Sequence, residues 1–251
     1  MSDLCLLGEV CRDDLADQIH GHRFLWCGDG HARLGDIGCY YSTRVIAGSP
    51  TVHALSVAND GAALDARIVQ LRVRLVDTLV VIFAVHSHSR IGDARGIRRR
   101  EVATILRAAI DISRNDTDHV LVLGDFNDEP FDQSVSEMLR TSRDAALVLQ
   151  RRNLLYNPSW RFMHDSRADE NLRSFVGTAH KRELDTHWRA FDQVLMSGGW
   201  LQPTSALQFA GLCEVILPAA LLGEDQRTLR GFDHLPIAAK FTIELTRRPP
   251  Q

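Results

Sequence analysis

The sequence predicts an α/β fold, and three neighbouring features carry that prediction. Two short and wholly apolar segments, 79–85 and 120–123, are typical of strands that are buried on both faces. Between them, apolar residues recur at helical spacing and indicate an amphipathic helix. These residues are Val102, Ile105, Leu106, Ala109 and Ile110. A strand, a helix and a second strand in this order form the repeating unit of a layered α/β protein.

The other elements are predicted from the same kinds of pattern. Residues 68–75 alternate between apolar and polar side chains, as in a half-buried strand. Residues 133–139 fit a short helix, whereas 153–186 is polar and irregular. Two late segments, 191–197 and 236–245, are expected to be strands.

The composition is that of an ordinary soluble globular protein. Of the 251 residues, 45% are hydrophobic and 24% are charged, so we expect one domain over 1–246 and a disordered tail at 247–251. No segment approaches the ~18 apolar residues of a membrane span, so no membrane contact is expected. The N-terminus lacks a secretory pattern, and the five cysteines include no Cys-x-x-Cys pair. Both features favour reduced thiols and a cytoplasmic location.

Positive charge is concentrated in one segment of a chain whose net charge is -3. Within this segment lie Arg90, Arg95, Arg98, Arg99 and Arg100. Because a planar guanidinium suits phosphate better than an ammonium group does, we expect Arg90 and Arg99 to bind substrate. The chain has only two lysines, however, and a coding preference for arginine would produce the same bias.

The segment 120–128, Val-Leu-Val-Leu-Gly-Asp-Phe-Asn-Asp, is the most informative in the chain. It reads as a buried strand that ends in Asp125 and Asn127, and ligands bind at such strand ends in α/β proteins. In an extended segment these two side chains would lie on the same side, where a carboxylate and an amide suit a phosphoryl group. An Asx turn leaving the strand would explain the same residues without any function.

Other acids and histidines also stand at the ends of elements. They are Glu9, His86, Asp192, Asp233 and His234. Oxygen ligands with few soft ligands favour Mg²⁺ or Mn²⁺ over zinc. A histidine that a carboxylate orients is a common general base near neutral pH. Taken alone, Glu9 also fits a solvated acid, and Asp192 fits an ordinary acid at the edge of a strand.

Five motifs occur in chain order. They are Leu7-Gly8-Glu9-Val10, Val85-His86-Ser87-His88-Ser89-Arg90, Gly124-Asp125-Phe126-Asn127-Asp128, Phe191-Asp192-Gln193-Val194-Leu195 and Phe232-Asp233-His234-Leu235-Pro236. Together they resemble the motif series of the endonuclease/exonuclease/phosphatase superfamily. The resemblance spans nearly the whole chain and implies the DNase I-like fold, a four-layer α/β sandwich of two packed mixed β-sheets flanked by helices.

A further pattern resembles bacterial members of that superfamily whose substrate is unassigned. It consists of Tyr156-Asn157-Pro158-x-Trp160, then Gly177-Thr178, then Trp188. We expect Asn157 and Trp188 to bind substrate.

The resemblance implies a role for each matching residue around a single cation. Glu9 would be the principal ligand of Mg²⁺ or Mn²⁺, with Asp233 as a second carboxylate near the metal. His234 would activate the attacking water, and Asp192 would hold its imidazole. This is in-line displacement at phosphorus, helped by the metal as a Lewis acid.

The resemblance also implies which residues bind the phosphate. Asp125 and Asn127 would position the nucleophile and contact the scissile phosphate, and Asp125 is a candidate for protonating the leaving group. His86 would donate a hydrogen bond to a phosphate oxygen.

Several departures from the family pattern bear on metal binding. Gly8 stands where the family has glutamine, Val85 where asparagine is frequent, and Phe232 where serine is usual. The usual first strand, with an asparagine that supports the metal, is expected to be missing. Three explanations would account for the missing strand. They are truncation of the domain, a start of the sequence that was assigned too late, and a partner chain at the exposed N-terminal sheet edge.

The leading hypothesis is therefore a Mg²⁺- or Mn²⁺-dependent phosphodiester hydrolase, a nuclease whose partner is nucleic acid. A phosphatase or phosphodiesterase for a small molecule or lipid headgroup is the alternative, which the negative net charge favours. A catalytically inactive binding module of the same fold is a third possibility, which Gly8 and the missing strand favour.

Overall fold

The computed structural model describes residues 2–10, 19–27, 36–46, 48–55, 58–59, 62–63, 66–163, 177–180, 188–217, 221 and 233–244. The chain divides into two compact units, Met1–Asp125 and Phe126–Gln251. Both combine several β-sheets with few helices, which confirms the predicted mixed α/β class. The single domain over 1–246 stays a prediction, and the expected tail at 247–251 lies outside the described residues. None of the helices in the described ranges is long and apolar enough to span a membrane.

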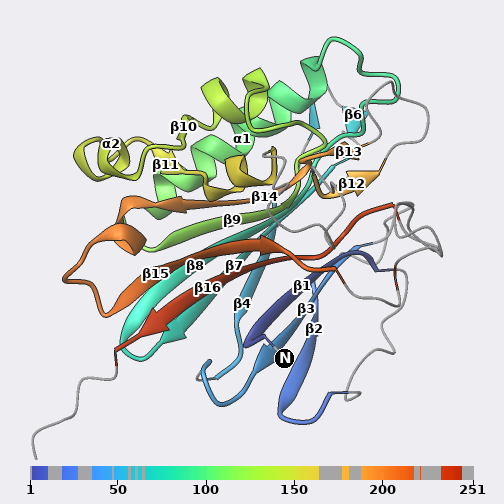
Figure 1. Cartoon of the computed structure of the whole chain (residues 1–251). Coiled ribbons are helices and arrows are strands. Elements are labelled where there is room, and N and C mark those ends of the chain that lie inside the picture. The colour runs from blue at the N-terminus through green and yellow to red at the C-terminus, as the bar shows by residue number, and fades with distance from the viewer. Residues whose placement is uncertain are drawn as a thin grey trace, which may run out of the picture. The chain divides into compact units, whose positions relative to one another are not determined.

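The main sheet of the first unit contains the strands that the apolar runs predict. Its order is β4 (Thr51–Leu55), β7 (Arg67–Leu75), β8 (Thr78–His86) and β9 (Val120–Asp125) (Figure 1). β8 and β9 are parallel, and the other two pairings are antiparallel. The parallel pair requires a crossover, which α1 (Ile97–Ser113) supplies.

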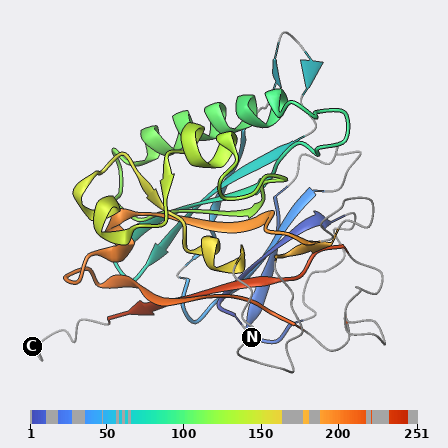
Figure 2. The same ribbon diagram turned by 45° about the horizontal axis from the view of Figure 1, so that its top comes forward.

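Helix α1 lies along one face of this sheet (Figure 2). Val102, Leu106 and Ile110 are buried, as their spacing predicts. Gln70 on β7 donates a hydrogen bond to the Ser113 hydroxyl at 2.9 Å, which fixes the C-terminal end of the helix against the sheet. The crossover returns the chain to β9, so β8 and β9 end at the same edge.

A second sheet of the first unit begins at the N-terminal strand. It has the order β1 (Leu4–Val10), β3 (Asp36–Ser42) and β2 (His22–Trp26), and all its pairings are antiparallel. Among the described strands, β1 pairs only with β3, so it lies at the edge of its sheet. A partner chain at this edge stays a prediction. A two-stranded ribbon, β5 (Ala58–Asn59) and β6 (Ala62–Ala63), completes the unit.

The second unit is built from short strands and helical turns around two longer strands. β10 (Thr141–Ser142), β11 (Leu155–Tyr156) and β14 (Asp192–Ser197) are neighbours in that order, and β12 (Ala179–His180) pairs with β13 (Trp188–Arg189). β15 (Leu207–Val215) and β16 (Ile237–Ile243) form an antiparallel ribbon. Its helices are η1 (Ser134–Met138), α2 (Ala145–Gln150), η2 (Pro158–Met163) and η3 (Gly198–Leu201).

The structure confirms the late strands and the short helix that the sequence predicts. β14 and β16 lie within the predicted ranges, and the short helix expected at 133–139 is η1, a single π-helical turn. The core around β16 contains Trp200 and Phe209, whose rings lie 4.6 and 5.8 Å from that of Phe241. This packing holds β15, β16 and η3 together.

Candidate active site

In the first unit, the parallel strands β8 and β9 place His86 beside Asp125. The two residues are opposite each other in the register, and the Ser87 N–H donates to the Asp125 carbonyl at 2.8 Å. Gly124 makes this approach possible, because it has a φ of 137° and a Cβ there would lie 2.0 Å from the Val85 carbonyl oxygen. The glycine of the Gly-Asp-Phe-Asn motif is therefore a steric requirement of the strand pair.

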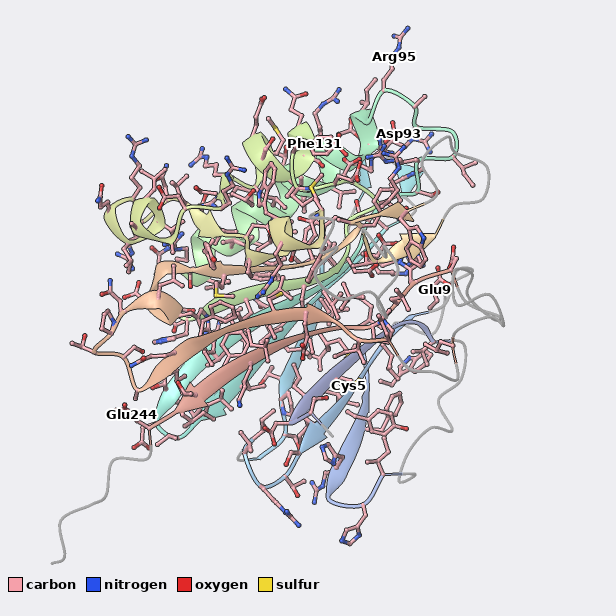
Figure 3. All side chains as sticks on the ribbon, viewed as in Figure 1. Cys5, Glu9, Asp93, Arg95, Phe131 and Glu244 are labelled. Atoms are coloured by element: carbon pink, nitrogen blue, oxygen red, sulfur yellow. The ribbon has the colours of Figure 1, made fainter. Side chains whose placement is uncertain are left out.

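Glu9 reaches the same region of the first unit from a β-bulge in β1. The pairing with β3 shifts between Leu7 and Val10, and Glu9 has a φ of 55° in the left-handed region. Bulges of this kind redirect a side chain and are frequent beside active sites. Glu9 Oε1 lies 3.7 Å from His86 Nε2, and the Glu9 side chain is 71% exposed. Figure 3 shows Glu9 at the end of β1.

The loop after β8 is ordered by a buried histidine and a buried carboxylate. His88 Nε2 lies 2.9 Å from the Arg98 guanidinium, which can only donate, so Nδ1 carries the proton and donates to the Ser89 carbonyl. The Asp93 carboxylate accepts from the backbone N–H groups of Arg98 and Arg99. This carboxylate caps the start of α1 and fixes the shape of the loop.

The same carboxylate also holds one of the arginines that are predicted to bind substrate. The Arg99 guanidinium lies 3.3 Å from Asp93, and the residue is only 5% exposed. This ion pair makes Arg99 part of the loop scaffold, and its contact with substrate stays a prediction. Arg90 is half-buried, whereas Arg95 is exposed and points outward from the loop (Figure 3). Of the five arginines in this segment, Arg95 and Arg98 are the exposed ones.

Asn127, at the start of the second unit, is not in an extended segment. Its φ is 50°, and the residue is 5% exposed. Asparagine tolerates this left-handed conformation better than most residues do. The prediction that period-two alternation aligns Asp125 with Asn127 is therefore wrong, because β9 ends at Asp125. The proposed phosphate-binding role of Asn127 stays a prediction.

The tightest pair of predicted catalytic residues lies in the second unit. His234 Nδ1 and Asp192 Oδ2 are 2.7 Å apart, and their side chains are 26% and 17% exposed. Asp233 Oδ1 lies 4.0 Å from His234 Nε2, and its side chain is 60% exposed. The structure therefore brings together a carboxylate–imidazole dyad and a second, exposed carboxylate, as the sequence predicts for this part of the chain.

A buried polar network supports the backbone around Asp192. Gln193 donates from Nε2 to the Asp128 carbonyl at 2.7 Å and accepts from Asn157 Nδ2 at 2.8 Å. The side-chain Oδ1 of Asn157 in turn accepts from the Ser159 N–H, and the Phe126 N–H donates to the Phe191 carbonyl. Asn157 is 0% exposed and has a structural role in this network, and its predicted contact with substrate stays a prediction.

Sequence reasoning missed the residues that support the dyad. Gln193 lies between Asp192 and the apolar residues 194–196 of β14, and an amide beside a predicted catalytic acid is a signal that could have identified it. Glu129 and Arg189 form an ion pair of 2.9 Å, which ties the loop after Asn127 to β13. Trp188, the neighbour of Arg189, is half-buried, and its expected contact with substrate stays a prediction.

The donor set of each unit fits a hard cation. Glu9 in the first unit and Asp233 in the second present carboxylates with side chains 71% and 60% exposed. Carboxylate oxygens and water are the ligands that Mg²⁺ and Mn²⁺ prefer. Burial raises the pKa of Cys213 to about 11, which leaves its thiol protonated at neutral pH.

Solved structures with similar folds cover almost the whole chain. The human Nocturnin catalytic domain with bound sulfate anion is 13% identical, has a TM-score of 0.59, and is matched over 96% of this chain and 81% of its own. D. rerio TDP2 complexed with single-strand DNA product is 12% identical, with a TM-score of 0.58 and coverage of 96% and 86%. These likenesses show the fold, the DNase I-like arrangement that the motifs predict.

A phosphatase has the same fold. The mannosyl-6-phosphatase of Bacteroides thetaiotaomicron is 13% identical, has a TM-score of 0.53, and is matched over 90% of this chain and 78% of its own. No curated protein sequence matches the chain. A family model does match, over residues 52–234, which is well over half of the sequence and includes three of the five motifs whole and the Asp233-His234 pair of a fourth. The chain belongs to the Endonuclease/Exonuclease/phosphatase family, whose members are phosphoesterases.

Proposed function

We propose that this protein is a divalent-metal-dependent phosphodiester hydrolase that acts on nucleic acid. The observation that carries the proposal is the 2.7 Å contact between Asp192 and His234. A carboxylate that holds Nδ1–H fixes the tautomer, so Nε2 is the atom that accepts a proton. An imidazole prepared in this way suits the activation of water for attack at phosphorus.

The protein's own residues would divide the remaining tasks. His234 takes a proton from the attacking water, and Asp192 stabilises the imidazolium that forms. Asp125 and Asn127 position the nucleophile and the scissile phosphate, with Asp125 also a candidate for protonating the leaving oxygen. His86 donates a hydrogen bond to a phosphate oxygen, where negative charge increases in the transition state.

The exposed carboxylates would hold the metal. Glu9 is proposed as the principal ligand and Asp233 as a second carboxylate near it. When bound, Mg²⁺ or Mn²⁺ would supply Lewis-acid neutralisation of charge on the phosphate oxygens. Their exposure of 71% and 60% supports a role that requires access to a hydrated ion.

Nucleic acid is the substrate class that the arginine-rich loop favours. D. rerio TDP2, which has the same fold, binds a single-strand DNA product. The ordered loop of this chain presents exposed Arg95 and Arg98 before and at the start of α1. Guanidinium groups on a rigid loop bind phosphate at a lower entropic cost than those on a flexible loop do.

A phosphatase for a small molecule is the second candidate. The mannosyl-6-phosphatase of the same fold and the net charge of -3 favour it, because no overall positive field attracts a polyanion. A lipid-headgroup phosphodiesterase and a binding module without catalysis remain outcomes of the same test.

A metal-dependent activity screen tests the proposal. Purified protein is assayed with Mg²⁺ or Mn²⁺ on single- and double-stranded DNA, RNA, small phosphomonoesters and phospholipid vesicles. Cleavage of a nucleic acid that chelation abolishes supports the proposal. Turnover of only the monoesters or lipids would contradict the proposal and would favour a phosphoesterase for a small molecule or a lipid headgroup. Inactivity on every substrate, with no Mg²⁺ binding by calorimetry, would indicate a binding module.

The salt dependence of binding tests the arginine-rich loop. We expect Arg95→Gln to weaken nucleic-acid binding and to reduce the slope of log K against log salt by about 1, because one phosphate contact is lost. Arg74→Gln, on the opposite end of β7 from the His86 edge, is the control. An equal change in both variants would mean that the loop makes no specific contact.

A further inference from the structure

Thr178 lies between the two backbone segments that carry the dyad. Its hydroxyl accepts a hydrogen bond from the Asp192 N–H at 2.9 Å. Its carbonyl accepts from the Leu235 N–H at 2.7 Å, and the next residue, Ala179, forms a β-bridge with His234. One residue therefore contacts the backbone of Asp192 and the backbone beside His234.

Thr178 itself is held from a third direction. Its N–H donates to the Arg189 carbonyl at 2.7 Å, and its hydroxyl lies 3.4 Å from the same oxygen. The preceding Gly177 has a φ of 132°, and a Cβ there would lie 2.6 Å from that carbonyl. The glycine allows the two backbones to approach, and this approach fixes where Thr178 stands.

All the polar groups of Thr178 are therefore engaged, and the residue is 0% exposed. These hydrogen bonds all join Thr178 to backbone atoms, so it holds the backbone of the dyad and not its side chains. A valine at this position would have nearly the same shape, but it would leave the Asp192 N–H without its acceptor. The hydroxyl is thus the feature that distinguishes threonine from its apolar isostere here.

We propose that Thr178 is a positioning residue, whose hydroxyl and carbonyl hold Asp192 and His234 at the separation that their hydrogen bond requires. The inference rests on the proposed function, since it assigns Thr178 a part in activating His234. The position of the Asp192 backbone sets where its carboxylate can reach, and the position of Leu235 sets the direction of the neighbouring imidazole. Loss of the hydroxyl releases one of these two restraints.

Three variants separate positioning from general stability. Thr178→Val removes the hydroxyl and keeps the shape, and Thr178→Ser keeps the hydroxyl. Thr141→Val makes the same chemical change at a buried hydroxyl on β10 that has no hydrogen-bond partner in the described structure. Each variant is assayed as the full chain with Mg²⁺, on the substrate that the wild type cleaves best, at a temperature where all are folded.

We expect Thr178→Val to lower kcat by up to ~10²-fold with KM unchanged, because a small misplacement of a general base has effects of that size. Thr178→Ser should restore most of the rate, and Thr141→Val should match the wild type. Wild-type kcat in Thr178→Val, or an equal loss in Thr178→Ser, would overturn the proposal. A higher KM with unchanged kcat would also overturn it.

The His234 Nδ1 proton gives a second measurement that needs no activity. A short hydrogen bond to a carboxylate moves this proton far downfield in the NMR spectrum and slows its exchange with water. The signal should be present in the wild type, Thr178→Ser and Thr141→Val, and lost or shifted upfield in Thr178→Val. An unchanged signal in Thr178→Val would overturn the proposal. An inactive wild type with the expected NMR pattern would contradict only the proposed function.

Discussion

The two units hold their predicted histidines in different ways. In the second unit, His234 lies 2.7 Å from Asp192, and both side chains are largely buried. In the first unit, His86 lies 3.7 Å from Glu9, whose side chain is 71% exposed. The first pair is a short hydrogen bond, whereas the second is beyond hydrogen-bond distance. Each unit therefore pairs a carboxylate with a histidine, but the pair has a fixed geometry in the second unit and an adaptable one in the first.

The difference follows from the backbone beneath each pair. Asp192 and the segment around His234 are held by hydrogen bonds to Thr178, and the buried amide of Gln193 supports the adjoining loop. Glu9 stands on a bulge in a strand that pairs with only β3 among the described strands. A general base benefits from a fixed position, whereas a ligand of a hydrated cation must adjust to it.

The largest expected effect concerns the fixed pair. We expect His234→Ala to lower kcat by ~10³-fold or more, because a positioned general base contributes 10²–10⁴-fold. Steady-state kinetics with saturating Mg²⁺ measure it. Asp192→Asn should have an effect of similar order, and the double variant should lose little more than either single variant, since the two residues act as one unit.

An exposed histidine supplies the control for that loss. His53 on β4 is exposed, and His53→Ala should keep wild-type activity. If His234→Ala retains most of the activity, or if the two losses add fully in the double variant, the dyad is not the general base.

The next largest effect concerns the Glu9–His86 pair of the first unit. We expect Glu9→Gln to raise the Mg²⁺ concentration for half-maximal activity by ~10–100-fold, because the side chain loses its charge but keeps its shape. Metal titrations of activity give the Mg²⁺ concentration for half-maximal activity, and calorimetry gives the dissociation constant of Mg²⁺. Glu244→Gln, an exposed acid just after β16 (Figure 3), is the control and should leave both constants unchanged. An unchanged metal requirement in Glu9→Gln would remove Glu9 from the metal site.

The stability of the two units can be compared through one glutamine in each. Gln193→Leu leaves Asn157 Nδ2 and the Asp128 carbonyl without their partner, so we expect a loss of about 2 kcal/mol in the free energy of unfolding. Gln70→Leu breaks a single half-buried bond to Ser113 and should cost about 1 kcal/mol. Urea denaturation measures both. Equal losses would mean that the polar network adds no more than one ordinary hydrogen bond.

The sequence predicts the elements that depend on hydrophobic pattern and the site residues that depend on the order of the motifs. Apolar runs identify β8, β9 and β14, helical spacing identifies the buried face of α1, and the motifs identify Asp192 and His234 as a pair. These features are local, or they follow from a motif series that the fold keeps in order.

The sequence does not predict features that depend on backbone conformation or on burial by distant segments. The left-handed φ of Asn127 breaks the alternation that an extended segment would have. Asn157 and Arg99 are of residue types that commonly contact a phosphate, yet tertiary packing buries them against Gln193 and Asp93. Polar residues in a motif can therefore be buried and hold the backbone of a site in place, and the sequence alone does not show which residues are buried in this way.

The smallest expected effect tests how tightly the second unit packs around β15. Burial raises the pKa of Cys213 from 9.0 to about 11, so the folded state disfavours the thiolate that the unfolded chain forms more readily. The resulting stability is fully present below pH 9 and is lost as the pH rises toward 11, with about 1 kcal/mol lost by pH 10. Cys213→Ala should remove that part of the alkaline decline, measured by urea denaturation between pH 8 and 10. Cys5→Ala, in the half-buried edge strand β1, should remove less. A Cys213→Ala variant that declines as steeply as the wild type would mean that water reaches β15 before the protein unfolds.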